Sequence, residues 1–165
     1  MKIFIFGIVA SGKTTLAKRL SLKLRIPYYE GDCITWGFPG EERYKHTEEE
    51  QKDIIDNIDS NGDWIIEGTY RESQSCLFDR AETVIFLDTP IHIRIYRIIL
   101  RFIKQRLGME KSHYKPTFDM LKMMFRWTYD FEKKRCWYEE MLVPYNHKLL
   151  RVKSEKELPD KFQQA

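Results

Sequence analysis

Short apolar runs alternate with longer amphipathic segments along the whole chain. The most continuous runs cover residues 2–6, 64–68 and 83–88, and weaker runs cover 26–32 and 147–152. Short runs that are apolar on consecutive positions are typical of strands buried on both faces of a sheet. The pattern therefore predicts five strands, separated by segments with a helical period.

Helices are expected between these strands. Leucines recur at four-residue spacing after the first strand, and Thr47 with Glu50 forms a capping-box pattern before a helix that ends near Ser60. Two longer helices are expected from Ile91 to Leu107 and from about Thr117, and a short one starts near residue 154. The helix from Ile91 has an apolar side and a basic side. Its expected core-facing residues are Ile91, Ile95, Ile98, Ile99 and Phe102, and its basic stripe is Arg94, Arg97, Arg101 and Lys104.

This order of elements predicts an α/β fold. Strands that alternate with helices pair in parallel through right-handed crossovers, and ligands bind at the carboxyl ends of such strands. Asp32, Glu67 and Asp88 all stand at predicted strand ends. A chain of 165 residues suits one domain, residues 1–165, with helices on both faces of the sheet.

The junction between the first strand and the first helix carries a phosphate-binding pattern. Gly7, four intervening residues and Gly12-Lys13-Thr14 match the Walker A motif. The glycines let the main chain approach phosphate oxygens, the lysine supplies a charge for the β- and γ-phosphates, and the threonine hydroxyl suits Mg²⁺. The cofactors expected are therefore ATP and Mg²⁺, and the ATP-binding residues expected are Gly7, Ala10, Ser11, Gly12, Lys13, Thr14 and Thr15.

Two other interpretations of this segment are weaker. A pattern with four free positions occurs by chance in unrelated proteins, but here a strand precedes it and an amphipathic helix follows it, which is the context the motif requires. A secretory signal would stay apolar where Lys13 stands, and the charged sequence continues without a break to Lys23.

Composition narrows the class of protein. With 42% hydrophobic and 32% charged residues the chain is typical of a globular protein, and no apolar run approaches the length of a membrane-spanning helix. The three cysteines are far apart, which disfavours a disulfide framework or a zinc site and fits a cytoplasmic protein. The net charge of +3 is small, but basic residues dominate the region from Arg94 to Arg135.

Taken together, these segments resemble a small P-loop kinase of the adenylate kinase type, and most closely the bacterial family named DNA topology modulation protein. The resemblance extends over nearly the whole chain. It rests on residues 7–14, 29–36, 64–70 and 84–88, and on the neighbourhoods of Tyr96-Arg97 and Phe125-Arg126-Trp127. It implies a three-layer P-loop NTPase fold with a five-stranded parallel sheet of order 2-3-1-4-5, and a short lid at about residues 104–117. Two departures are a glutamate at position 67, where relatives usually carry aspartate, and the shortness of the lid.

The resemblance also implies roles for residues outside the loop. Lys13, Asp32, Arg97 and Arg101 are expected to be catalytic. Asp32 would accept a proton from an acceptor hydroxyl, and the two arginines would reach the transferring phosphoryl group. The expected acceptor-binding residues are Asp32, Trp36, Gly68 and Arg71, and the expected metal ligands are Thr14 and Glu67.

Ordinary structural roles stay open for several of these residues. Asp32 could cap a helix or stabilise a turn, Glu67 could be a solvated residue at a strand end, and the arginine stripe could be a solvated helix face.

Two functions are consistent with the sequence. The first is an ATP- and Mg²⁺-dependent phosphotransferase that acts on a nucleoside, a nucleotide or another small hydroxyl-bearing acceptor. The second is an ATP-binding regulatory protein associated with DNA, in which the basic region from Arg94 to Arg135 contacts nucleic acid. The kinase is favoured because no recognised nucleic-acid-binding motif is present. The sequence predicts no membrane partner, and it leaves the acceptor and the oligomeric state open.

Overall fold

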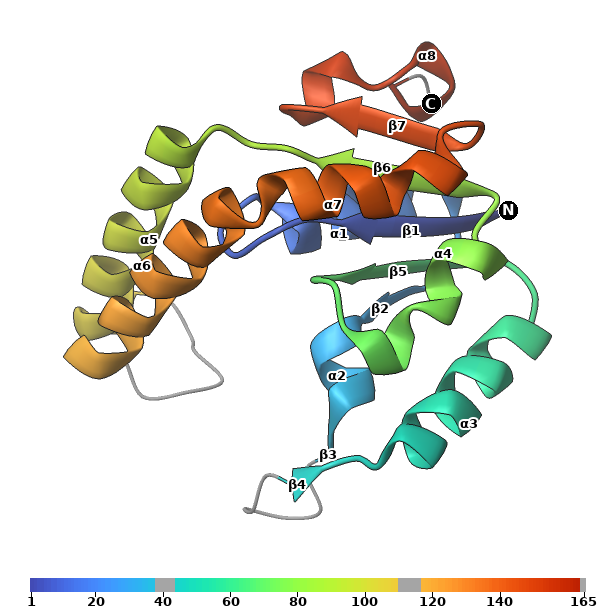
Figure 1. Cartoon of the computed structure of the whole chain (residues 1–165), viewed down its shortest axis with the longest axis horizontal. Coiled ribbons are helices and arrows are strands. Elements are labelled where there is room, and N and C mark those ends of the chain that lie inside the picture. Colours follow the sequence, from blue (N-terminus) through green and yellow to red (C-terminus); the bar gives the residue numbers. More distant parts are fainter. Residues whose placement is uncertain (38–43, 110–116, 164–165) are drawn as a thin grey trace.

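A five-stranded parallel sheet forms the centre of the computed structural model, which describes residues 1–37, 44–109 and 117–163. The spatial order is β2-β5-β1-β6-β7 (Figure 1). The strands are β1 (Lys2–Phe6), β2 (Tyr28–Glu30), β5 (Trp64–Gly68), β6 (Thr83–Leu87) and β7 (Leu149–Val152). Counted along the chain, this is the predicted order 2-3-1-4-5, and the predicted α/β fold is confirmed.

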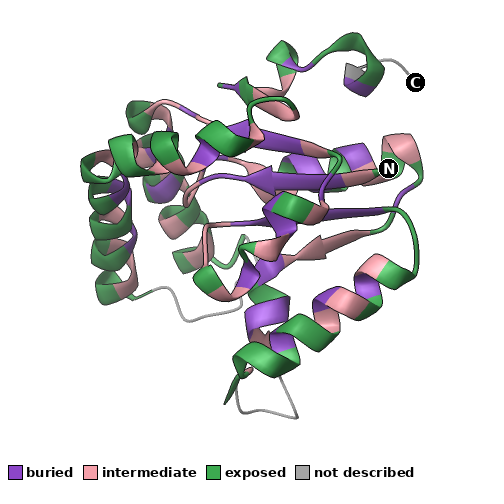
Figure 2. Ribbon diagram, turned by 45° about the vertical axis from the view of Figure 1, so that its right-hand side comes forward, coloured by how far each residue is buried: buried purple, intermediate pink, exposed green. Residues whose placement is uncertain are grey.

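The register brings the carboxyl ends of the three central strands together. β1 pairs with β5 from Lys2↔Trp64 to Phe6↔Gly68, and with β6 up to Phe6↔Phe86. These strands are almost completely buried, as their continuous apolar sequences predicted (Figure 2). The segment after Phe6 therefore begins between the ends of two neighbouring strands.

Alternate side chains of β1 point into two separate cores. Ile3 and Ile5 share a core with Leu16 and Leu20 of α1 (Lys13–Leu24). Leu158, just after η3 (Glu155–Glu157), and Phe162 of α8 (Asp160–Gln163) belong to the same core. On the other face, Phe4 and Phe6 contribute to a core with residues of α3 (Glu48–Ser60), α4 (Cys76–Arg80), α6 (Phe118–Lys133) and α7 (Arg135–Leu142). The sheet is thus covered on both faces.

A short helix follows β2 directly. The predicted strand over 26–32 ends at Glu30, because Gly31 begins α2 (Gly31–Thr35), so Asp32 lies in the first turn of a helix instead of at a strand end. The chain continues through β3 (Trp36–Gly37) and β4 (Tyr44–Lys45) to α3, whose predicted Thr47–Glu50 capping box is present. After β5, η1 (Glu72–Gln74) leads into α4.

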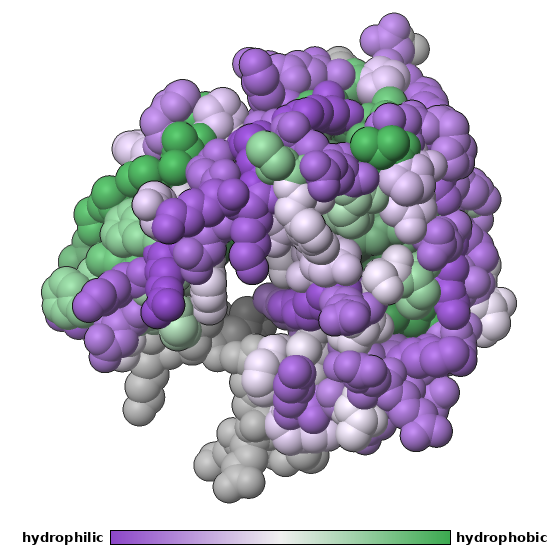
Figure 3. Space-filling view, viewed as in Figure 1, coloured by the Kyte–Doolittle hydropathy of each residue, from purple (hydrophilic) through white to green (hydrophobic). Residues whose placement is uncertain are grey.

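The helices α5 (Ile91–Arg106) and α6 pack on each other and extend to one side of the sheet as an α5–α6 arm (Figure 1). Hydrophobic side chains gather on the arm's outer surface, and a hollow separates the arm from the part of the molecule that carries α2 (Figure 3). The chain then passes through α7 and η2 (Val143–Tyr145) to β7.

The predicted faces of α5 are wrong in two respects. Arg94, expected in the basic stripe, is completely buried with Ile98, whereas Ile91 and Ile99 are exposed. Arg94 is buried because it has partners inside the protein. Its Nε donates to the Thr89 carbonyl at 2.9 Å, it forms an ion pair with Glu132 of α6, and its guanidinium lies over the Phe131 ring.

Candidate active site

Residues 7–12 form a tight loop between β1 and α1 in which glycine is required at both ends. A Cβ on Gly7 would lie 2.9 Å from Ser11 Oγ and 3.0 Å from the Leu87 carbonyl oxygen. Gly12 has φ 102°, in the left-handed region, and a Cβ there would lie 3.2 Å from Arg97 Nη1. The two Walker A glycines therefore allow the loop to pack against β6 and α5.

The amino terminus of α1 is open toward this loop. Gly12 provides no side-chain cap, and the first hydrogen bond of the helix runs from Leu16 N to Gly12 O at 3.0 Å. The amides before Leu16 therefore have no partner within the helix, and they carry the positive end of its dipole. Ser11 Oγ is also buried, and no atom of the described residues hydrogen-bonds to it. A cradle with open donors at a helix amino terminus fits the phosphate groups of a nucleotide.

Lys13, Thr14 and Glu67 form the charged centre of the loop. Lys13 Nζ donates to the Ile8 carbonyl at 3.0 Å, and Thr14 Oγ1 donates to Glu67 Oε1 at 2.6 Å. Burial lowers the pKa of Lys13 and raises the pKa of Glu67, and the attraction between these opposite charges counteracts both shifts. A polyanionic ligand beside them would favour the charged form of Lys13, and a bound cation would favour the charged form of Glu67.

The pair formed by Thr14 and Glu67 fits Mg²⁺ bound together with a nucleotide. Mg²⁺ prefers oxygen ligands, keeps several waters, and is usually held by one or two protein groups plus substrate phosphates. Within the described residues, no group of three or more His, Cys, Asp or Glu could hold a metal ion. The oxygen atoms at Thr14 and Glu67 thus suit an ion whose remaining ligands come from phosphate and water.

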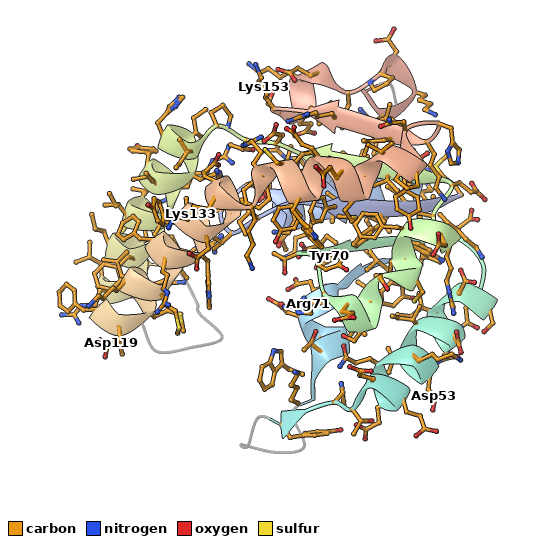
Figure 4. The ribbon with its side chains drawn as sticks, in the orientation of Figure 1. Asp53, Tyr70, Arg71, Asp119, Lys133 and Lys153 are labelled. Atoms are coloured by element: carbon orange, nitrogen blue, oxygen red, sulfur yellow. The ribbon has the colours of Figure 1, made fainter. Side chains whose placement is uncertain are left out.

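A cavity of about 570 Å³ opens beside the loop. The loop, α1, α5 and the segment after β7 all contribute to it. Lys153, which begins that last segment, is labelled in Figure 4. The residues that line the cavity include Ala10, Ser11, Gly12, Thr15, Leu100, Lys104, Lys153 and Ser154. The volume falls in the range of small-molecule and cofactor sites.

The basic residues of α5 have different environments. Arg97 Nη1 donates to the carbonyl oxygens of Ala10 at 3.2 Å and Ser11 at 2.6 Å, and both Arg97 and Arg101 line the cavity. Arg94, by contrast, is buried and belongs to the ion-pair network described above. The basic stripe is therefore not one surface, and two of its arginines face the predicted ATP site.

Thr89 also supports the loop, a role that the sequence did not predict. Its Oγ1 lies 2.9 Å from the Ser11 carbonyl oxygen and 3.2 Å from that of Lys153, and its side chain is buried. Its position just after the carboxyl end of β6 was the available signal. Asp88, the residue before it, forms ion pairs with Arg135 at 3.1 Å and Arg151 at 2.8 Å.

The predicted acceptor residues lie near the ends of β2 and β5. Arg71 Nη2 and Asp32 Oδ1 form an ion pair at 2.5 Å, and Arg71 Nη1 is buried without a hydrogen-bond partner in the part of the chain that the structure describes. The Gly68 carbonyl accepts a hydrogen bond from Gly7 N at 3.2 Å, which connects this region to the loop. Trp36 is half-buried at the start of β3.

A buried amide holds α2 in place. Gln74 Nε2 donates to the Gly31 carbonyl at 3.1 Å and to Thr35 Oγ1 at 2.9 Å, so η1 is joined to both ends of α2. Asp32 lies on α2, and Arg71 lies just before η1. Gln74 thus fixes the two segments that carry the ion pair, a role with no sequence signal.

The sheet order, the glycine loop and the lysine at the start of α1 place this protein in the P-loop class. A family model described as an AAA domain matches residues 3–114, and the chain belongs to this family. No curated protein sequence matches the chain.

Several solved structures with a similar fold are described as small-molecule kinases. Shikimate kinase from Bacteroides thetaiotaomicron has a TM-score of 0.53 and 16% identity, covering 99% of this chain and 92% of that one. Shikimate kinase from Acinetobacter baumannii, in complex with shikimate, has a TM-score of 0.53 and 14% identity, covering 99% and 89%. A gluconokinase from Sinorhizobium meliloti 1021 has a TM-score of 0.51 and 16% identity, covering 92% and 81%. These likenesses show that the chain shares the fold of these proteins, and the narrower resemblance to the DNA topology modulation family stays a prediction.

Two further expectations from the sequence concern a membrane-spanning helix and the lid. None of the helices in the described parts of the chain is long and apolar enough to cross a membrane. The lid expected at about residues 104–117 includes 110–116, which lie outside the described residues.

Proposed function

We propose that this protein transfers the γ-phosphoryl group of ATP to an oxygen atom of a small-molecule acceptor held near Asp32 and Arg71. The observation that carries this proposal is the arrangement around the loop. The open amino terminus of α1 and Lys13 lie beside a nucleotide-sized cavity, and the adjoining strand ends lead to a carboxylate–guanidinium pair. The kinase structures that share the fold add support.

Phosphoryl transfer asks the protein mainly to position groups and neutralise charge. The loop amides, Ser11 Oγ and Lys13 would hold the donor phosphates, with Arg97 and Arg101 beside them. Thr14 and Glu67 would hold Mg²⁺ directly or through water. When bound, Mg²⁺ neutralises charge on the β- and γ-phosphates.

The acceptor groups have roles that depend on the acceptor. An acceptor oxygen forms a bond to the γ-phosphorus while the bond to the β–γ bridging oxygen breaks, and ADP leaves with that electron pair. For a hydroxyl acceptor, Asp32 takes the proton. For a phosphate acceptor the attacking oxygen is already deprotonated, so Asp32 orients Arg71, which binds the anion.

The test is a panel of nucleosides, nucleotides and small alcohols incubated with Mg²⁺ and labelled ATP. We expect transfer to at least one acceptor, and a decrease of about a hundredfold or more in the Lys13→Ala variant, because that change removes a phosphate-binding charge. Lys18→Ala is the matched control, since Lys18 is an exposed lysine on the same helix. Normal ATP binding without transfer to any acceptor would refute the kinase proposal.

A DNA retardation assay distinguishes the kinase from the alternative, an ATP-binding regulatory protein associated with DNA. Binding through basic residues should weaken steeply with salt because counterions are released. Retardation at low salt in a protein that binds ATP but transfers no phosphate would favour this alternative over the kinase.

A further inference from the structure

A second cavity, of about 520 Å³, has a composition different from the first. Its lining consists of Tyr70, Lys133, Lys134, Cys136, Trp137 and Tyr138. Aromatic rings and lysines make up nearly all of it, and none of these described residues is acidic. Such a lining suits a ligand that combines a flat ring with negative charge.

This cavity lies on the acceptor side of the candidate active site. Tyr70 precedes Arg71, and both belong to the loop after Gly68, whose carbonyl accepts a hydrogen bond from the first Walker A glycine, Gly7. The Tyr138 ring centroid is 5.9 Å from that of Phe6, the last residue of β1. Figure 4 labels Tyr70 and Arg71 beside the carboxyl end of β5 and Lys133 on the arm. The cavity is therefore built from elements that adjoin the P-loop.

The rings of this cavity are held by one another. The Tyr70 and Trp137 rings meet edge to face with centroids 5.0 Å apart, as do the Trp137 and Tyr138 rings. Tyr138 also packs at 4.7 Å on Phe131, a buried core residue. Trp137 nevertheless keeps 44% of its surface exposed. A large ring that is fixed in position but partly open to solvent provides a ready surface for stacking.

Cationic groups lie beside these rings. Lys133 and Lys134 are exposed at the junction of α6 and α7, and both line the cavity. On the loop that carries Tyr70, Arg71 Nη1 is buried and has no hydrogen-bond partner among the described residues, although Nη2 is paired with Asp32. An unpartnered guanidinium nitrogen leaves a donor for one more anionic oxygen.

We infer that this cavity binds the acceptor, and that the acceptor is a planar aromatic ring joined to an anionic group, as in a nucleoside monophosphate. The ring stacks on the exposed part of the Trp137 ring, and the anion is bound by the lysines at the α6–α7 junction together with Arg71. This inference rests on the proposed kinase function, because it names the substrate class of the same site.

The experiment measures calorimetric binding to the full chain with four kinds of probe. Nucleoside monophosphates carry ring and anion, the matching nucleosides lack the anion, ribose 5-phosphate lacks the aromatic ring, and aromatic carboxylates test whether the anion must be phosphate. We expect at least one nucleoside monophosphate to bind about tenfold or more tightly than its nucleoside and than ribose 5-phosphate, because stacking and charge-assisted hydrogen bonds each contribute at least a factor of this size. If an aromatic carboxylate binds better than the monophosphates, the proposed acceptor still combines an aromatic ring with an anionic group, but that group is a carboxylate instead of a phosphate.

Variants test the two parts of the cavity separately. Trp137→Ala should weaken the monophosphate about tenfold, and Trp137→Phe, which keeps a ring, should restore most of the affinity. Lys133→Gln with Lys134→Gln should weaken the monophosphate about tenfold and leave the nucleoside unchanged. The control pair Lys122→Gln with Lys161→Gln removes the same charge from exposed positions that do not line the cavity.

Failure of this inference and failure of the kinase proposal are distinguishable. Equal affinity for monophosphates and ribose 5-phosphate, no monophosphate binding at all, or no effect of Trp137→Ala would overturn the inference. Phosphorylation of a non-aromatic acceptor under those conditions would leave the kinase intact. A protein that binds monophosphates but not ATP would overturn the kinase proposal instead.

Discussion

Replacing Arg94 with methionine tests the buried ion pair that joins α5 to α6. Methionine keeps much of the aliphatic length but removes the guanidinium. The variant loses the hydrogen bond from Nε to the Thr89 carbonyl and the pair with Glu132. Since Thr89 Oγ1 contacts the Ser11 carbonyl, the change also loosens a support of the P-loop.

The expected loss of stability can be worked out from these contacts. The hydrogen bond to Thr89 contributes about 1 kcal/mol, a typical net value. Removing one partner of a fully buried ion pair costs about 3–5 kcal/mol. The Glu132 side chain, however, is 27% exposed, and in the variant it still has Arg135, at 3.0 Å, as a partner. We therefore expect the loss of the ion pair to cost only about 2 kcal/mol. The sum of about 3 kcal/mol corresponds to a decrease of about 6–12 °C in melting temperature for a chain of this size.

Urea unfolding of a double-mutant cycle measures this quantity. The cycle consists of Arg94→Met, Glu132→Gln and the double variant, and we expect a coupling free energy of about 1–2 kcal/mol between the two sites. Arg126→Met serves as the control, because Arg126 is 81% exposed and its contact with Asp130 is 3.9 Å long, so the change should cost less than about 0.5 kcal/mol. A loss below about 1 kcal/mol for Arg94→Met, or no coupling, would refute this reasoning.

Three further predictions concern the loop and the acceptor side. Burial raises the pKa of Glu67, so the native state binds its proton more readily than the unfolded chain, and the wild type loses stability as the pH rises from about 4.5 through that raised pKa. The Glu67→Gln variant should therefore have a higher melting temperature than the wild type at pH 8, and the difference should shrink toward pH 4. A lower melting temperature for the variant at pH 8 in thermal scans would contradict this prediction. Gly12→Ala should cost about 1–2 kcal/mol of stability and weaken ATP binding in calorimetry. Gly62→Ala is its control, because φ is 108° there but no atom lies within 4 Å of the added Cβ, so stability should fall while ATP affinity stays unchanged. Gln74→Met should lower the free energy of unfolding by about 1–3 kcal/mol and speed hydrogen exchange in α2, whereas unchanged exchange would argue against its anchoring role.

The elements that sequence patterns predicted well are those with a strong local signal. The runs at 2–6, 64–68 and 83–88 are apolar on consecutive positions because both faces of the sheet are covered, and all three are central strands. The glycine loop was predictable because its spacing and its context are both local. The Thr47 cap was predictable for the same reason.

What sequence patterns missed depends on contacts between distant segments. Arg94 has the helical spacing of a solvent-facing stripe, and only the approach of Glu132 from α6 explains its burial. The helix α4 spans five residues, too few for a period to emerge, and its position follows from the packing of Phe78 on Phe4 and Phe6. A Cβ on Gly31 would lie 3.0 Å from the Glu67 carbonyl oxygen, so this glycine lets α2, with Asp32 in its first turn, begin close against β5. Gln74 acts entirely through such long-range contacts.

The two outermost strands of the sheet are also its shortest. β2 has three residues and β7 has four, against five in each of β1, β5 and β6. Unpaired amide and carbonyl groups along an outer strand are a template on which another polypeptide can add, and proteins limit this hazard with short borders, prolines and charged side chains. Pro27 stands just before β2, and Arg151 lies within β7. The sheet therefore offers little edge for self-association or fibril growth, even where its interior is strongly apolar.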